Sequence, residues 1–251
     1  GVLAMSQDLN EIANSFDNSH AKAQNYRLIL CAASKFRRFD DIIEKVSEGL
    51  DYVKTTGHDS IYHVLLCIKA QAHIYKGELN KAENTILEAE KKLQKIKSIP
   101  VYYTHYLVAK VRFEFEKVKT LPLTDKNNRS RLKELKKTTN KLLKQSKKVV
   151  GNLTEAYLLT AKINGFLNKG NKAIQYFELA IATAEKYNGR LELSRAYFET
   201  GKFLSDPNNK FNQLNGISAA DYLEKARTMF EEMDLQWDMA DSERFVEGIT
   251  E

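Results

Sequence analysis

The sequence predicts an all-α protein, folded as a right-handed superhelix of helical hairpins. Three segments carry small, large and small residues at offsets of zero, four and seven, which places them on one stripe of a helix. The stripes are Ala82, Ile86 and Ala89; Ala173, Phe177 and Ala180; and Ala219, Leu223 and Ala226. Small residues let a neighbouring helix approach closely, and the large residue fills the remaining space. Stripes that recur along a chain indicate an array of hairpins.

Composition supports this fold class. The 251 residues include only three prolines and eleven glycines, too few to separate many short strands. Ala, Leu, Lys and Glu, which favour helices, dominate the chain. The chain is longer than a usual compact domain, but repeat arrays escape that limit because each unit packs only on its neighbours. We therefore expect a single superhelical domain over residues 1–251.

Apolar periodicity predicts eleven or twelve helices joined by short turns. Asp8 and Glu11 resemble a capping pair at the first helix, and breaks follow at residues 37–38, 56–57 and 76–77. The expected helices are residues 8–16, 20–36, 39–55, 60–76, 79–97, 100–119, 129–149, 153–168, 171–187, 190–204, 217–233 and 236–247. We expect an irregular basic hairpin at about 101–149 and a polar insertion loop at about 205–216.

The hairpin pattern resembles the tetratricopeptide repeat (TPR), a helix-turn-helix unit of about 34 residues. The best copy covers residues 63–96, and weaker copies cover 23–56 and 154–187. In the best copy the matching positions are Leu66, Ala70, Gly77, Ala82, Ile86 and Ala89. The anchors Ile42, Ala82, Ala173 and Ala219 are unevenly spaced, so the repeats are stretched. Residues 190–204 and 220–233 resemble the C-terminal helical arrays of bacterial signalling ATPases, transcriptional activators and cyclase-linked ATPases.

The resemblance implies that the first helix of each hairpin lines a concave groove. Aromatic and long cationic side chains on such a wall could hold a peptide or protein. The groove positions carried over from the repeat are Arg27, Gln71, Tyr75, Tyr103, Tyr106, Lys110, Lys162 and Tyr197. The alternative is that half of the tyrosines only fill the core of an irregular superhelix. The resemblance thus implies a protein-interaction scaffold or sensor in a signalling or regulatory assembly, with a possible effector domain in cis.

Charge is concentrated in the middle of the chain. Residues 117–148 contain twelve Lys or Arg against Asp125 and Glu134, so their local net charge is +10 while the whole chain carries +6. The candidate basic surface is Arg131, Lys133, Lys136, Lys137, Lys141, Lys144, Lys147 and Lys148. This surface could contact nucleic acid, an anionic lipid surface or an acidic partner, including the acidic end of another copy. The alternative is a solvated helix face, which is what charge runs usually are.

Catalysis finds little support in the sequence. The five histidines share no metal-ligand spacing, and no glycine-rich phosphate loop is present. We therefore predict no enzyme activity, no catalytic residue, no metal and no cofactor. Two cysteines, Cys31 and Cys67, give no disulfide framework, and no apolar run approaches the roughly 20 residues of a membrane span. We expect a cytoplasmic protein. Gly1 ahead of the internal Met5 is typical either of residues left by cloning or of a fragment excised from a larger protein.

Overall fold

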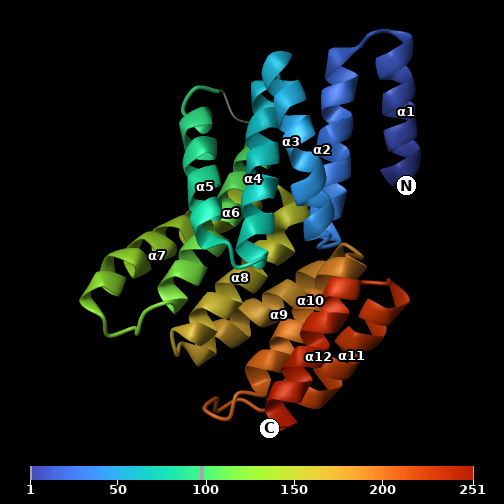
Figure 1. Ribbon diagram of the computed structural model, residues 1–251. Coiled ribbons are helices and arrows are strands. Elements are labelled where there is room, and N and C mark those ends of the chain that lie inside the picture. The colour runs from blue at the N-terminus through green and yellow to red at the C-terminus, as the bar shows by residue number, and fades with distance from the viewer. Residues whose placement is uncertain (1, 97–98, 251) are drawn as a thin grey trace. The chain divides into compact units, whose positions relative to one another are not determined.

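The computed structural model describes residues 2–96 and 99–250, which form two compact units (Figure 1). Residues 1–138 make the first unit and residues 139–251 the second, so the division falls inside α7. The first unit contains α1 (Val2–Ser15), α2 (Ser19–Lys35), α3 (Phe39–Thr55), α4 (Asp59–Tyr75), α5 (Leu79–Leu93), α6 (Pro100–Lys119) and the start of α7 (Lys126–Ser146). The predicted all-α class is confirmed. The first helix begins well before the predicted start at Asp8.

The second unit continues with a 3₁₀ turn and five helices. Its elements after α7 are Val150–Asn152 (3₁₀), α8 (Leu153–Phe166), α9 (Gly170–Lys186), α10 (Arg190–Leu204), β1 (Gln213–Leu214), β2 (Ile217–Ser218), α11 (Ala219–Glu232) and α12 (Gln236–Thr250). The two short strands pair antiparallel. Strand β1 lies in the segment expected to be a polar loop, whereas β2 occupies the first two residues of the helix expected at 217–233, which begins at Ala219 instead. Asn215 and Gly216 both have positive φ at their turn, as a tight hairpin requires.

Most helices end in the same way, with one residue just after the helix whose backbone has a positive φ, in the left-handed conformation. Gly57 and Gly77 occupy this position after α3 and α4, and Asn168 and Asn188 occupy it after α8 and α9. The following backbone N–H then returns to a carbonyl of the last helical turn, for example from Glu78 to the carbonyl of His73 at 2.9 Å. These tight ends reverse the chain within a few residues and so produce consecutive antiparallel helices.

In the first unit, alternate helices form one layer. Helix α4 packs along α2 and α6, while α3 and α5 pack on α4 as the second helices of their hairpins. We call α2, α4 and α6 the first A layer. The predicted stripe on α5 is confirmed, because Ala82, Ile86 and Ala89 are all buried. Helix α4, at the centre of the unit, is buried over most of its length.

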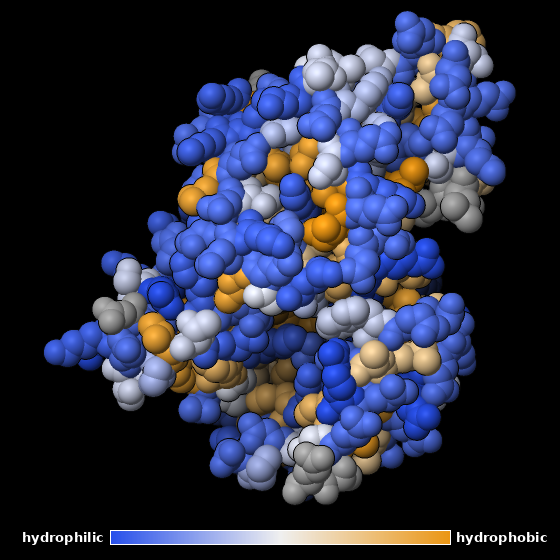
Figure 2. Space-filling model, viewed as in Figure 1, coloured by the Kyte–Doolittle hydropathy of each residue, from blue (hydrophilic) through white to orange (hydrophobic). Residues whose placement is uncertain are grey.

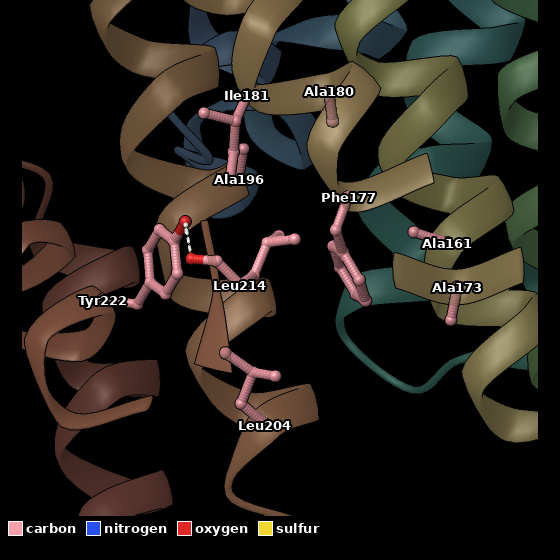
Figure 3. Packing of buried hydrophobic residues seen from close by; sticks show 9 residues of the cluster. All are labelled: Ala161, Ala173, Phe177, Ala180, Ile181, Ala196, Leu204, Leu214 and Tyr222. Atoms are coloured by element: carbon pink, nitrogen blue, oxygen red, sulfur yellow. Dashed lines mark hydrogen bonds between the residues drawn. The ribbon is translucent and has the colours of Figure 1, made fainter. Parts of the chain in front are cut away.

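The second unit repeats this arrangement. Helix α10 packs along α8 and α12, and the pairs α8–α9 and α10–α11 form hairpins. We call α8, α10 and α12 the second A layer. The stripe of Ala173, Phe177 and Ala180 is buried in the core shown in Figure 3. There the hydroxyl of Tyr222 donates to the carbonyl of Leu214, which ties α11 to the strand pair.

The third predicted stripe is shifted on its helix. Ala226 is buried as expected, but Ala219 and Leu223 are only half-buried. The buried stripe of α11 is formed by Tyr222, Ala226 and Phe230 instead. Leu223 points to α10, where its side chain lies against Gly201. The small residue that permits close helix approach at this point is therefore on the partner helix.

Candidate functional site

The first A layer gathers aromatic rings and guanidinium groups from three helices. The guanidinium carbon of Arg27 on α2 lies 6.0 Å from the ring centre of Tyr102 on α6. Tyr75, at the end of α4, has the guanidinium carbons of Arg37 and Arg112 at 5.2 and 5.0 Å from its ring centre. Two of the predicted groove residues, Arg27 and Tyr75, thus meet cation–π partners on this layer.

Tyr75 is held in place from a third side. Its ring stacks on Phe39 of α3, with 4.4 Å between ring centres and 16° between ring planes. Tyr75 as a whole remains half-buried. A flat aromatic surface between two cations is an arrangement that can receive carboxylate or aromatic groups of a ligand.

Gln71 and the cysteines lie deeper in the first unit. Gln71 and Cys67 are buried on α4, and Cys31 on α2 is half-buried. Burial raises the pKa of both thiols above the ordinary value, so neither is a ready thiolate nucleophile. The sulfur of Cys67 lies 3.8 Å from Nε2 of His63, a histidine whose pKa burial lowers. These groups belong to the core of the layer.

Three further predicted groove residues follow one side of α6. Lys110 Nζ lies 3.7 Å from the carboxylate of Glu90 on α5, and Tyr106 is buried with a hydrogen bond to the same glutamate. Tyr103 stacks on Tyr106 at 6.2 Å between ring centres. Tyr106 and Lys110 therefore face α5, the second helix of the preceding hairpin, and the binding role predicted for all three residues stays a prediction.

The sequence interpretation missed Tyr102 and Arg112 on α6. One residue turns a helix by about 100°, so a one-position error in register exchanges one side of the helix for another. Tyr102 and Arg112 contact Arg27 and Tyr75, and so belong to the first A layer. The pattern of the repeat was too weak after Pro100 to fix this register.

The second A layer carries a row of ion pairs. Lys162 of α8 pairs with Glu199 of α10. One turn away on α10, Arg195 binds the carboxylate of Asp238 on α12 through two hydrogen bonds of 2.9 and 2.8 Å. Asp238 is fully buried. The predicted groove residue Lys162 is thus engaged by a carboxylate within the unit.

Tyr197 lies on the other side of α10. Its hydroxyl donates to Glu185 of α9 at 3.2 Å, and its ring packs 5.5 Å from Tyr222 of α11. Burial and the nearby Glu185 raise the pKa of Tyr197. Tyr197 also lines an open hollow of about 500 Å³ with residues of α11, among them Asp221, Lys225 and Met229. Its predicted partner-binding role stays a prediction.

The basic surface predicted on α7 is largely solvent-exposed. Lys133, Lys136, Lys137, Lys141, Lys144, Lys147 and Lys148 are exposed, and the surface over α7 in Figure 2 is mainly hydrophilic. Arg131 is different, because it donates at 3.0 Å to the carbonyl of Lys117 near the end of α6. Lys137 pairs with Glu134 at 3.4 Å, the one acid of α7.

Two features are absent from the part of the chain that the structure describes. Over residues 2–96 and 99–250, no group of three or more His, Cys, Asp or Glu side chains is placed to hold a metal ion. Within the same part of the chain, no helix has both the length and the apolar character needed to cross a membrane.

Comparisons with known proteins identify the fold. No protein-family model matches the chain, and no curated protein matches it. Its structure is similar to the crystal structure of a signal transduction ATPase with numerous domains (STAND) protein with a tetratricopeptide repeat sensor from Pyrococcus horikoshii. The TM-score is 0.58 and the sequence identity 19%, over 96% of this chain and 33% of that chain. The chain thus spans about a third of that protein's length, and its fold is a TPR-like helical array.

Proposed function

We propose that this chain is a non-catalytic sensor module of a cytoplasmic signalling or regulatory assembly, which binds a peptide or protein on the first A layer. The similar Pyrococcus horikoshii protein is a signal transduction ATPase with a tetratricopeptide repeat sensor, and a comparable ATPase is the effector domain we propose in cis. Folds of this kind serve many functions, so the residues of the layer must carry the argument.

The observation that carries the proposal is the set of rings and guanidinium groups on α2, α4 and α6. Arg27 with Tyr102, and Tyr75 with Arg112, bring together two of the residue types that are enriched at binding hot spots. On the second A layer, Lys162 and Arg195 bind carboxylates within the unit. We therefore place the ligand on the first unit and expect it to carry carboxylate or aromatic side chains.

Binding on three helices at once gives a physical route to signalling. The curvature of a repeat array is the sum of small rotations between neighbouring hairpins. A ligand that touches α2, α4 and α6 binds best to the conformation with one particular set of these rotations. Its binding therefore shifts the population of the protein toward that conformation. An effector domain that senses the curvature would then respond to the ligand.

Site-specific photo-crosslinking tests the location of the ligand. A benzophenone amino acid at Tyr102 or Tyr75 should crosslink a discrete partner in cells that make the protein. The matched control is the same amino acid at Leu87, an exposed apolar residue on α5. Crosslinks from Leu87 with none from Tyr75 or Tyr102 would contradict the proposal.

A second candidate function is polyanion binding by α7. The observation that favours it is the exposure of seven lysines on or just after a helix with a single acid. A protein that neutralises phosphates releases counterions, so its affinity falls steeply with salt. Binding of single-stranded DNA that falls with salt and is lost on combined Lys136→Glu, Lys137→Glu and Lys141→Glu substitution would support this function. Binding that is unchanged by the three substitutions would exclude it.

A further inference from the structure

The part of α7 that belongs to the first unit, residues 126–138, buries little apolar surface. Among its described residues Leu135 is the one buried hydrophobic side chain, and the other buried side chains, Asn128 and Thr138, are polar. Segments that bury few apolar groups open locally at a lower free energy than the core of a domain does. The packing of this segment on α6 therefore depends strongly on polar contacts.

Hydrogen bonds join the start of α7 to the end of α6. Asn128 Nδ2 donates to the carbonyls of Val118 and Leu121, both at 3.0 Å, and Arg131 Nη1 donates to the carbonyl of Lys117 at 3.0 Å. An amide group does not titrate, and a guanidinium keeps its proton in proteins. The contacts at this end of the hairpin are therefore the same in mildly acidic and in neutral solution.

Farther along the hairpin, a carboxyl group of α6 is buried. Glu114 is only 8% exposed, and neither of its carboxylate oxygens accepts a hydrogen bond within the described part of the chain. Its ion-pair partner is Lys110, whose Nζ lies 3.8 Å from Oε1 of Glu114 and 3.7 Å from the carboxylate of Glu90 on α5. One ammonium group is thus shared by two carboxylates, so it compensates the charge of an ionised Glu114 only in part.

The surroundings of Glu114 favour its protonated form. The titratable and charged groups that face it are Glu90 of α5, Tyr106 and Lys110 of α6, and Glu134 of α7. Burial has the largest effect and raises the pKa of Glu114 to about 7, and the carboxylates of Glu134 and Glu90 add to this increase. The Thr138 hydroxyl of α7 and the Lys110 ammonium oppose it. Burial also raises the pKa of Tyr106, which is therefore uncharged in neutral solution.

Movement of α7 away from α6 would allow water to reach this carboxyl group. The pKa of a hydrated glutamate is about 4.3. Between about pH 4.3 and 7, the closed hairpin therefore holds a proton that the open hairpin has lost, so opening becomes more favourable as the pH increases.

We propose that residues 132–138 of α7 separate from α6 when Glu114 is ionised and pack on α6 when Glu114 is protonated. The hydrogen bonds of Asn128 and Arg131 hold the turn, so the opening is local. The open form exposes Leu135 to solvent, and its population increases between mildly acidic and neutral pH. This proton-dependent opening does not require a ligand on the first A layer.

Hydrogen exchange of the backbone amides, resolved by nuclear magnetic resonance, tests the role of Glu114. Each rate is divided by the intrinsic exchange rate at the same pH, which leaves the equilibrium constant for opening. For residues 132–138 this constant should increase roughly fiftyfold between pH 5 and pH 8, and in Glu114→Gln it should stay nearly constant. The matched control is Glu116→Gln, which should behave as the wild type because Glu116 pairs with Lys119 at the surface of the same helix.

Urea below the unfolding transition separates local opening from unfolding of the whole unit. Global unfolding exposes much surface and is strongly favoured by urea, whereas a local opening exposes little. The amides of α4, which is buried over most of its length, should exchange more slowly than those of residues 132–138 and should accelerate with urea. Equal rates and equal urea dependence in the two segments would overturn the proposal. It would also be overturned if the opening of residues 132–138 depended on pH in Glu114→Gln as it does in the wild type.

Discussion

Arg195 and Asp238 form a two-pronged ion pair between α10 and α12. The Nε and Nη2 atoms of Arg195 donate to the two carboxylate oxygens of Asp238 at 2.9 and 2.8 Å. Asp238 is completely buried and the Arg195 side chain is 13% exposed. Two parallel hydrogen bonds fix both the spacing and the angle of two planar groups. The pair therefore sets how α12 sits on α10.

Removing one partner of this pair should lower the free energy of unfolding. Asp238→Ala leaves a buried guanidinium without its carboxylate, and breaking a buried pair in this way costs about 3–5 kcal/mol. We expect a loss of this size in the free energy of unfolding, measured by urea denaturation of the second unit's helices. The matched control is Arg190→Ala, because Arg190 pairs with Glu232 between two exposed side chains. An exposed pair contributes only about 0–1 kcal/mol, so equal losses from the two substitutions would contradict the prediction.

Gly201→Ala should destabilise the contact between α10 and α11. A Cβ at Gly201 would lie 2.7 Å from the side chain of Leu223 and 3.2 Å from the carbonyl oxygen of Ala219. Alanine gains about 1 kcal/mol over glycine inside a helix, but overpacking costs about 1–3 kcal/mol. We expect a net loss of stability in thermal unfolding. Gly248→Ala on α12 meets nothing within 4 Å, so it should be neutral or stabilising. A higher melting temperature for Gly201→Ala would show that α11 is not packed as closely as described.

Glu114 should make the first unit less stable as the pH rises. Burial raises the pKa of Glu114 to about 7, against the lowering effects of Thr138 and Lys110; the nearby Glu134 and Glu90 add to the increase. In the unfolded chain its pKa is near the ordinary value of about 4.3. Between these pH values the folded form holds a proton that the unfolded form has lost, so stability falls as pH increases from about 4.3 to 7.

Glu114→Gln should remove this fall of stability with increasing pH. At pH 8 the substitution should raise the free energy of unfolding by up to about 3 kcal/mol, and at pH 4 the difference should nearly vanish. The matched control is Glu116→Gln, on the same helix, where Glu116 pairs with Lys119 and is partly exposed. Denaturation curves across this pH range test the prediction. If the free energy of unfolding varied with pH in the same way for the wild type and for Glu114→Gln, Glu114 would be ionised in the folded protein and the prediction would be wrong.

The fold could be predicted from the sequence because its signals are local. Small and large residues at helical spacing, such as Ala173, Phe177 and Ala180, decide both the helix and its buried side. The short strand pair was not predicted, although Asn215 and Gly216 carry the usual turn signal between two apolar residues. A strand pair of two residues each is too short to show alternation.

The site was harder to predict because it depends on helix register and on distant partners. Tyr102 and Tyr103 are neighbours in sequence, yet it is the ring of Tyr102 that meets Arg27 of α2. Arg195 and Asp238 are 43 positions apart, and each alone reads as an ordinary surface charge on a helix. Only the packing of α12 on α10 brings them together.

The most direct test of the account is the affinity of the crosslinked partner's binding segment for variants of the first A layer. The segment should bind the wild-type chain, and combined Arg27→Ala and Tyr102→Ala substitution should weaken it by at least about 2 kcal/mol, roughly thirtyfold, as loss of hot-spot residues does. Leu87→Ala on α5 should leave the affinity unchanged, with the fold of both variants checked by circular dichroism. Unchanged affinity in the Arg27 and Tyr102 variant would contradict the proposal that α2, α4 and α6 form the binding surface.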